Sequence, residues 1–300
     1  MKILQFSFRL KFERGIELEV IIKRIKYLAM SDFWKNILSI SLGITTTGFS
    51  FIPENFFREI KRWSILPIYW SDTINKLCFL LLISVIVAVT ICLYRRYRTS
   101  VRFKGQDYNI VVEYGDIFNQ EKCKKVINFD ECYSTEVGNS PHQIKPTSIC
   151  GQFLVKFPNL NIGYLINSHS LKPLRKRSKF ENRECFESGT LMANGDYLLM
   201  AFGKLNGDGR TEMSREDYLN SLRTLWQELD KYYTQSDIAI PVLGAGITRF
   251  QDCLLDQQQL VDIIICSYKM SPYKLKLPNT LHIICKKAPD FSLNKVLRAL

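Results

Sequence analysis

The sequence predicts an α/β domain preceded by an α-helical membrane anchor with two spans. Two observations lead to this fold class. Residues 1–104 contain two long uncharged stretches, at 36–53 and 77–94, whereas short apolar segments alternate with amphipathic helical patterns from residue 105 onward. A helix needs about 20 mostly apolar residues to cross a bilayer. Alternating strands and helices are typical of a sheet that helices cover on both faces.

The distribution of charge separates these two parts. The chain has 300 residues and a formal net charge of +12; residues 1–104 contain 17 Lys/Arg against 7 Asp/Glu, and the remainder contains 24 against 22. Because the basic excess lies around the predicted spans, it favours a lipid bilayer as partner, and we expect no nucleic acid. The nine cysteines are irregularly spaced without a C-x-x-C pair, so we expect no disulfide framework, metal or cofactor. Cys266 and Cys285 lie in apolar runs and are expected in the core.

The two uncharged stretches differ in composition. The second ends at Arg95, Arg96 and Arg98, and the first is rich in Ser, Thr and Gly. Small residues let helices approach closely, so the first stretch is expected to face other helices, with a re-entrant or interfacial segment as the alternative. Basic residues at the outer ends place both ends of the anchor in the cytoplasm at the inner (cytoplasmic) membrane, as a multi-pass protein. The expected segments are a basic N-terminal segment (1–35), span 1 (36–53), an extracytoplasmic loop (54–76), span 2 (77–94), a basic juxtamembrane linker (95–104) and a ligand-binding domain (105–300).

The elements of the C-terminal domain follow from periodicity. A helix is expected from Ser214, which forms an S-x-x-D capping box with Asp217, and its apolar face contains Leu219, Leu222, Leu225, Trp226 and Leu229. A second helix is expected over 257–270, with Leu260, Ile263, Ile264 and Ser267 facing inward. Apolar strands are expected within 108–117, 124–129, 195–203, 236–244 and 280–287.

Polar and glycine residues follow three of these strands. "IPVLGAGITRF" ends a strand in Gly-Ala-Gly, where backbone N–H groups can surround phosphate oxygens and Arg249 can add a cation. "VVEYGDI" ends in Asp116, and "VINFDECYSTE" brings Asn128, Asp130, Thr135 and Glu136 after a third strand. Ligands bind at the carboxyl ends of strands in such sheets. An ordinary tight turn at the glycines and helix capping by Asp116 remain alternatives.

These motifs carry a resemblance. G-D-I at 115–117, V-I-N at 126–128 and P-x-L-G-x-G-I at 241–247, in this order, resemble a macro domain, the fold that binds ADP-ribose, over roughly residues 105–298. The resemblance implies a macro-domain-like mixed sheet flanked by helices. It further implies roles in ligand binding: Asp116 at the adenine, Gly244, Ala245, Gly246, Ile247 and Thr248 at the diphosphate, and Asn128 and Phe250 near the distal ribose. Ile117, Asp130, Thr135 and Glu136 are further expected ligand-binding residues, and Arg249 is expected to bind the ligand or to hold the loop.

The chain departs from the ADP-ribosyl hydrolases of that family. It lacks their second Asn and Gly-rich loop after Asn128, and is closer to a divergent branch with motifs at 128–135, 148–153, 189–190 and 241–249. Behind two predicted spans, this branch resembles the membrane-anchored macro-domain effectors of type II Thoeris antiphage defence.

The resemblance implies a TIR-domain partner enzyme that makes an ADP-ribose-type signal, in that system histidine-ADP-ribose. It also implies homo-oligomerisation on activation and disruption of the membrane, leading to abortive infection. We therefore expect a sensor without catalytic residues. The alternative is a membrane-tethered ADP-ribosyl hydrolase, with Asp130, Glu136 or His142 as the group that activates water.

Overall fold

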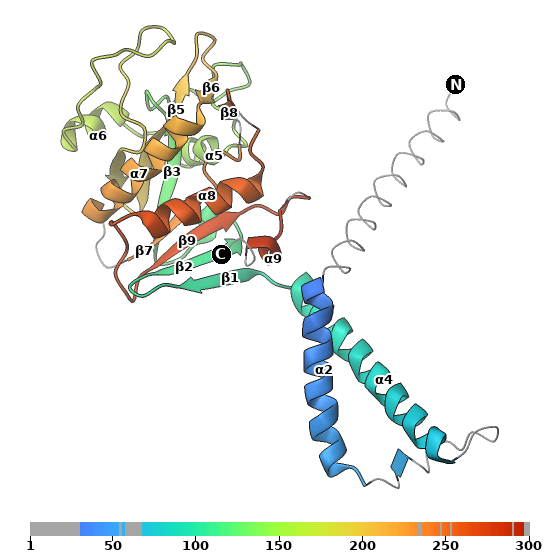
Figure 1. Cartoon of the computed structure of the whole chain (residues 1–300). Helices are drawn as coiled ribbons and strands as arrows, with labels where there is room; N and C mark the ends of the chain where they lie inside the picture. The colour runs from blue at the N-terminus through green and yellow to red at the C-terminus, as the bar shows by residue number, and fades with distance from the viewer. Residues whose placement is uncertain are drawn as a thin grey trace, which may run out of the picture. The chain divides into compact units, whose positions relative to one another are not determined.

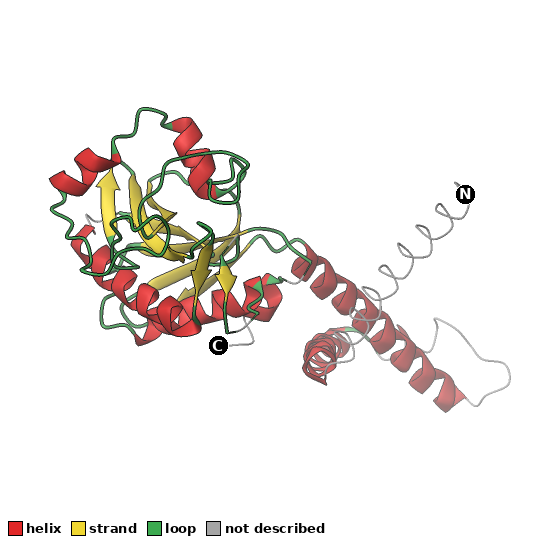
Figure 2. Cartoon of the chain, turned by 90° about the horizontal axis from the view of Figure 1, so that it is seen from above, coloured by secondary structure: helices red, strands yellow, loops and turns green. Residues whose placement is uncertain are grey.

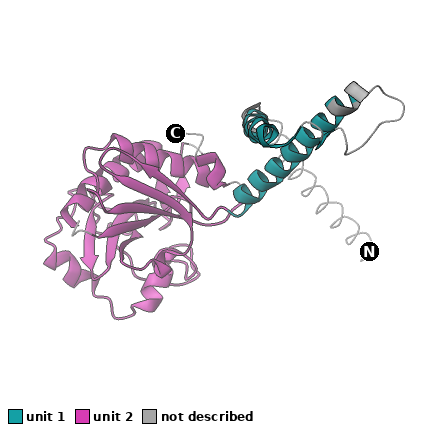
Figure 3. Ribbon diagram, turned by 90° about the horizontal axis from the view of Figure 1, so that it is seen from below, with its two compact units in different colours: residues 1–97 teal, residues 98–300 magenta. Residues whose placement is uncertain are grey.

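The computed structural model describes residues 31–53, 56–57, 68–232, 236–246, 248–252, 254–289 and 291–296 (Figure 1). The chain divides into two compact units, residues 1–97 and 98–300 (Figure 3). Most of the predicted N-terminal segment, much of the predicted extracytoplasmic loop, and Ile247 lie outside the described residues.

In its described residues, the first unit contains two long helices, α2 (Ser31–Phe51) and α4 (Ile68–Arg96), which pack against each other. On α2 the buried side chains are Ile37, Ser41 and Thr45, spaced four residues apart and therefore on one face. Two of the three are small, so this face permits a close approach of helices.

α4 has the length and composition of a membrane-spanning helix. The most apolar window of 18 residues within its segment Thr73–Arg96 has a mean hydropathy of 2.9, and only 6% of this window is buried in the structure. Side chains such as Leu81 and Val85 are 65% and 59% exposed. Within the described part of the chain, no other helix meets the same criteria, so span 1, at 36–53, stays a prediction. Both helices begin earlier than the predicted spans, at Ser31 and Ile68.

The second unit is built around a mixed sheet, as expected. In the described residues the strands run in the order β1-β2-β9-β7-β3-β5-β6-β8, with β4 also paired to β5. The central strands β2, β9, β7, β3 and β5 are parallel. β1 is antiparallel to β2, and β4 is antiparallel to β5. β6 is antiparallel to β5 and parallel to β8. The strands are β1 (Ser100–Lys104), β2 (Asn109–Tyr114), β3 (Cys123–Asp130), β4 (Leu191–Asn194), β5 (Tyr197–Leu205), β6 (Thr211–Met213), β7 (Asp237–Pro241), β8 (Arg249–Phe250) and β9 (Thr280–Cys285).

Helices lie on both faces of this sheet (Figure 2). Because side chains alternate along a strand, Leu198 and Met200 of β5 pack in one core with α7 and α8, while Leu199 and Ala201 pack in another with α5. The prediction of a sheet covered on both faces is therefore confirmed. The helical segments are η1 (Ile117–Asn119), α5 (Ile149–Lys156), α6 (Ile162–Ser168), α7 (Arg215–Tyr232), α8 (Gln257–Met270) and α9 (Leu293–Val296).

Three details differ from the expectations. Residues 100–104, which were assigned to a linker, form β1 and pair with β2, so the domain begins at Arg98. Leu219 is 46% exposed, because it lies outside the apolar stripe that begins at Tyr218 and Leu222. Cys266 is also exposed, because the buried face of α8 contains Ile264 and Ile265 and Cys266 lies on the opposite face. Cys285 is buried, as predicted.

Candidate ligand-binding cleft

A cavity of about 770 Å³ lies where the central parallel strands end. Gly115 and Asp116 follow β2, and Asn128 and Asp130 lie at the end of β3. The glycine loop, defined as Gly244, Ala245, Gly246 and Thr248, follows β7, and Lys286 follows β9. All of these residues line the cavity. This is the edge at which open α/β sheets bind ligands. Asp116, Asn128, Asp130 and the glycine loop, which the sequence predicted to share one site, therefore lie around one cavity.

The glycine loop is held in place from α7. The Tyr218 hydroxyl, which is buried, donates a hydrogen bond to the Leu243 carbonyl at 3.0 Å. The Phe250 ring packs edge-to-face on Tyr218, with 5.5 Å between centroids. Gly244 has φ +84°, and a Cβ there would approach Phe250 Cζ to 3.0 Å. The turn therefore requires glycine at this position.

Only part of the backbone of the glycine loop forms hydrogen bonds within the described part of the domain. The Ala245 N–H donates to the Val242 carbonyl at 3.2 Å, so it closes the turn. Neither Gly244 nor Gly246 donates its N–H to another of the described residues. These two N–H groups are the ones that the loop can offer to a bound anion.

The loop also separates two cavities. A second cavity, of about 560 Å³, shares Gly244, Ala245, Gly246, Thr248 and Arg249 with the first. Its remaining lining residues come from the segment after β8, the start of α8 and the segment after β9: Phe250, Leu254, Leu255, Asp256, Gln257 and Ala288. Phe250 thus lies on the second cavity's side of the loop.

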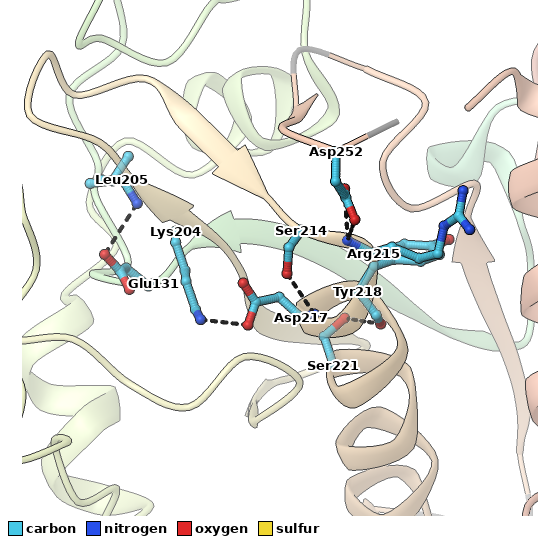
Figure 4. A network of polar contacts seen from close by, with 9 residues as sticks. All are labelled: Glu131, Lys204, Leu205, Ser214, Arg215, Asp217, Tyr218, Ser221 and Asp252. Carbon is cyan, nitrogen blue, oxygen red and sulfur yellow. Dashed lines mark hydrogen bonds and ion pairs between the residues drawn. The ribbon is translucent and has the colours of Figure 1, made fainter. Parts of the chain in front are cut away.

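Polar contacts join the segment after β8 to the start of α7 (Figure 4). The Asp252 carboxylate accepts the Arg215 N–H at 3.1 and 3.2 Å. The Ser214 hydroxyl oxygen accepts the Asp217 N–H at 3.1 Å, which confirms the predicted N-cap. Asp217 in turn forms an ion pair with Lys204 at 2.6 Å. These contacts tie the strand that follows the glycine loop to the helix that supports it.

Asp116 both caps a helix and lines the cavity. Its Oδ1 accepts the Phe118 N–H at 3.0 Å, so the side chain caps η1. The residue is also exposed and lines the cavity. One oxygen of the carboxylate is therefore used by the fold, while the group as a whole still faces the cavity.

The cavity has more cationic than anionic side chains along its lining. Lys145, Arg210, Arg249 and Lys286 line it, against the carboxylates Asp116 and Asp130. This balance suits a ligand that carries phosphates. Three of the cations were not expected from the sequence. Lys286 could have been found, because it lies at the carboxyl end of a predicted strand, whereas Lys145 and Arg210 lie in loops that only the fold brings to the cleft.

Asp130 lines the cavity but its Oδ1 is engaged in a local turn. Oδ1 accepts the N–H groups of Cys132 and Ser134, at 2.9 and 3.1 Å. Burial raises the pKa of the Asp130 carboxyl, although these hydrogen bonds and the Arg183 charge oppose the shift. Burial thus disfavours the ionised form of this carboxyl.

We expect Asp130→Asn to stabilise the domain at neutral pH. The amide keeps an oxygen for both N–H groups and removes a charge whose burial is unfavourable. Because the folded-state pKa is raised, the carboxyl favours folding fully only below its unfolded pKa of about 4, and this contribution is lost as pH rises through the folded value. Thermal unfolding should therefore show a higher Tm for the variant at pH 7 and a gap that closes in acid. A less stable variant at pH 7 would show that the Arg183 charge outweighs burial.

The other expected site residues are placed differently. Ile117 is buried beneath the cavity, which it lines. Thr135 and Glu136 are exposed and are not among the residues that line either cavity. His142 is exposed and lines the larger cavity, and its ring stacks on that of Phe180 with 6.2 Å between the ring centroids.

Two further motifs have a structural explanation. In 148–153, the Ser148 hydroxyl oxygen accepts the Gly151 N–H at 3.0 Å and caps α5, and a Cβ at Gly151 would meet the Lys145 carbonyl oxygen. In 189–190, Gly189 has φ +104° and lies against the Ser221 carbonyl of α7. Both glycines permit close backbone approach.

The fold and the cleft define a ligand-binding protein of the α/β class, with a cleft suited to a phosphate-bearing ligand. The family model described as Thoeris protein ThsA, Macro domain, matches residues 110–286, more than half of the chain. The chain therefore belongs to this family, as a ThsA-like macro-domain protein of Thoeris antiviral defence.

Sequence identity to individual known proteins is low. Thoeris protein ThsA of Bacillus amyloliquefaciens (strain Y2) is 20% identical over 286 residues, which cover 86% of this chain and 96% of that protein. The solved Oceanobacillus iheyensis macrodomain with ADP is 11% identical with a TM-score of 0.43, covering 67% of this chain and 95% of that one. The same macrodomain with MES bound is 10% identical with a TM-score of 0.38, covering 67% and 96%.

Proposed function

We propose that this chain is a membrane-anchored sensor and effector that binds an ADP-ribose-derived signal, histidine-ADP-ribose being the expected one, made by a TIR-domain enzyme. The observation that carries the proposal is the cleft at the carboxyl ends of the strands. It combines a carboxylate, a glycine loop and an excess of cationic side chains around one cavity.

Each part of such a ligand has a chemical counterpart in the cleft. The Asp116 carboxylate can accept a hydrogen bond from the exocyclic amino group of adenine. The N–H groups of Gly244 and Gly246, with Arg249 beside them, suit the oxygens of a diphosphate. Asn128, at the end of β3, offers an amide to the hydroxyls of the distal ribose. The ligand would therefore run along the edge of the sheet.

Binding is favoured over hydrolysis by the placement of the carboxylates. A hydrolase needs a base that can reach a water molecule beside the distal ribose. The Asp130 Oδ1 accepts two backbone N–H groups, and Glu136 lies outside the cavity lining. These positions support a sensor.

The output of the sensor would use the helices of the first unit. A ligand shifts an equilibrium only through different affinities for two states. We propose that binding favours a homo-oligomer of the chain, in which α2 and α4 repack within the inner membrane and disrupt it. Permeabilisation of vesicles that contain the full-length chain, upon addition of histidine-ADP-ribose, tests this step. Vesicles that stay sealed, with no change in oligomeric state, would contradict it.

Calorimetry tests the binding step directly. The protein should begin at Arg98, because β1 pairs with β2 and a shorter fragment would leave that strand edge open. We expect binding of ADP-ribose, of a cyclic isomer or of histidine-ADP-ribose, with the tightest of them identifying the signal. Absence of binding to all three would overturn the proposal.

The role of Asp116 can be isolated with a ligand that lacks the amino group. We expect Asp116→Ala to weaken binding of the adenine ligand by about 10–100-fold, because a hydrogen bond to a charged group contributes about 1.5–3 kcal/mol. The analogue with unsubstituted purine has a hydrogen in place of the amino group, so its affinity should be about the same for the variant and the parent.

Two controls accompany this measurement. Asp116→Asn keeps an oxygen that can accept the Phe118 N–H. Comparison of this variant with Asp116→Ala shows whether loss of the helix cap contributes to the loss of affinity. Asp107→Ala makes the same change of charge at an exposed residue outside the cleft lining. An equal loss of affinity for both ligands in Asp116→Ala would mean that Asp116 does not contact the adenine.

A further inference from the structure

Three polar side chains that are far apart in the sequence meet on one face of the sheet. They are Cys123 at the start of β3, Asp237 at the start of β7 and His282 near the start of β9. One potential ligand atom from each lies within 4.8 Å of the other two. The parallel strands place this cluster toward their amino ends, whereas the ligand cleft lies at their carboxyl ends.

We propose that Cys123, Asp237 and His282 form a binding site for a divalent cation of the zinc class. The donor set consists of a sulfur, an imidazole nitrogen and a carboxylate oxygen. Zn²⁺ binds these at about 2.3, 2.0 and 2.1 Å, usually in tetrahedral geometry. Ca²⁺ and Mg²⁺ select oxygen ligands, so a thiol and an imidazole favour zinc over them.

The orientation of the aspartate and the histidine supports the site. The Asp237 Oδ1 accepts the Thr280 N–H at 2.8 Å. This leaves Oδ2 directed at the His282 Nε2, 3.5 Å away. Two ligands of a tetrahedral zinc ion, each about 2 Å from the metal, lie about 3.3–3.5 Å apart. This pair already has the required separation.

His282 is itself oriented by a second carboxylate. Its Nδ1 lies 2.9 Å from the Glu113 Oε1 on β2. A histidine that binds a metal through one nitrogen usually donates the N–H of the other to a carboxylate or carbonyl group, which fixes the ring and increases its basicity. Glu113 is therefore a positioning residue in the proposed site.

The charges around the cluster also suit a cation. Burial and the Asp237 charge raise the pKa of the Cys123 thiol, and Lys125 opposes them. A bound divalent cation would instead favour the thiolate. The thiolate and the carboxylates of Asp237 and Glu113 would then be balanced by the metal and Lys125. The competing arrangement is a protonated His282 between the two carboxylates, with the thiol neutral.

A metal ion bound at the proposed site would stabilise the folded domain. It links β3, β7 and β9, three neighbouring strands in the centre of the sheet. Cys123 is 7% exposed, and the side chains of His282 and Asp237 are 17% and 38% exposed. An ion can therefore enter from solvent, and water can take a fourth coordination position.

Metal binding by the full-length chain, purified in detergent, tests the proposal. The protein is stripped with a chelator and titrated with Zn²⁺, and bound metal is counted by mass spectrometry. Co²⁺ is then used in place of Zn²⁺, since a thiolate ligand produces a charge-transfer absorption band in the near ultraviolet. We expect one ion per chain, a thiolate–cobalt band, and a higher Tm with Zn²⁺ than without it.

Variants identify the ligands. Cys123→Ser and His282→Gln should weaken zinc binding at least 100-fold, and Cys123→Ser should abolish the cobalt band. Asp237→Asn keeps an oxygen for the Thr280 N–H while it removes the charge. Glu113→Gln should weaken binding by about 10–100-fold. Cys266→Ser is the matched control, because it removes an exposed thiol of α8 outside the cluster.

Two results would overturn the proposal. One is a parent protein without bound Zn²⁺ and without a cobalt band at micromolar metal, which would favour the protonated His282 arrangement. The other is unchanged binding in Cys123→Ser and His282→Gln. If a variant fails to fold, as circular dichroism would reveal, the cobalt spectrum of the parent still decides whether a thiolate binds the metal.

Discussion

Gly246→Glu is expected to weaken binding of the ADP-ribose-type ligand by more than about 100-fold while the domain stays folded. A Cβ at Gly246 would meet none of the described atoms within 4 Å, so a side chain there enters open space. Gly246 lines both cavities. The new carboxylate would therefore occupy the cleft and repel the diphosphate. Two like charges 4 Å apart near a protein surface interact by about 4 kcal/mol, and about 2.7 kcal/mol corresponds to 100-fold.

Neighbouring substitutions separate this effect from damage to the loop. Gly246→Ala adds a methyl group in open space, and we expect a change in affinity of less than about threefold. Gly244→Ala forces a left-handed conformation on alanine, at a cost of about 1–2 kcal/mol, and crowds Phe250. It should lower the Tm, whereas Gly246→Glu should not.

Calorimetry and thermal unfolding of all three variants make this comparison. Parent-like affinity in a folded Gly246→Glu protein would show that the ligand does not bind against the glycine loop. The diphosphate would then have to lie elsewhere.

The double substitution Leu81→Arg and Val85→Arg is expected to release the chain from membranes. Each arginine at the centre of a spanning helix costs about 2.5–3.5 kcal/mol on insertion scales, so the pair costs about 5–7 kcal/mol. Both positions are exposed on α4, so neither change removes a buried side chain from the described part of the first unit. The proposed ligand-binding cleft lies in the second unit, so ligand binding should be unchanged.

Extraction of cell membranes with alkaline carbonate measures this effect. The parent chain should remain with the membranes and the double arginine variant should appear in the soluble fraction. Leu81→Ala with Val85→Ala is the control, because alanine shortens the same side chains without adding charge. A double arginine variant that resists extraction as the parent does would contradict the role proposed for α4.

Local pattern predicted the elements of the domain well where the pattern was long and regular. α8 has the predicted bounds, 257–270, and Ser214 caps α7 as expected. β1 was missed because "SVRFK" follows the arginines that end α4 and reads as part of a basic linker. Its conformation is decided by pairing with β2, a contact that the segment itself does not reveal.

The candidate cleft was predictable for a simple physical reason. Asp116 and the glycine loop each follow a strand, Asn128 lies near the carboxyl end of another, and the carboxyl ends of parallel strands meet at one edge of a sheet. Lys145 and Arg210 follow no such rule, because long loops bring them to the same cavity. Thr135 and Glu136 are close to Asn128 in sequence, yet the turn around Asp130 directs the chain away from the cavity lining.

The sequence by itself determined the α/β class, the apolar character of α4, and the chemistry available at the strand ends, because these depend on local composition and period. The tertiary structure alone decided which strands are neighbours. Strand order arises from long-range pairing and burial, which no local pattern specifies. The order β9-β7-β3 brings Cys123, Asp237 and His282 together. Three residues without a common motif thereby become one candidate metal site.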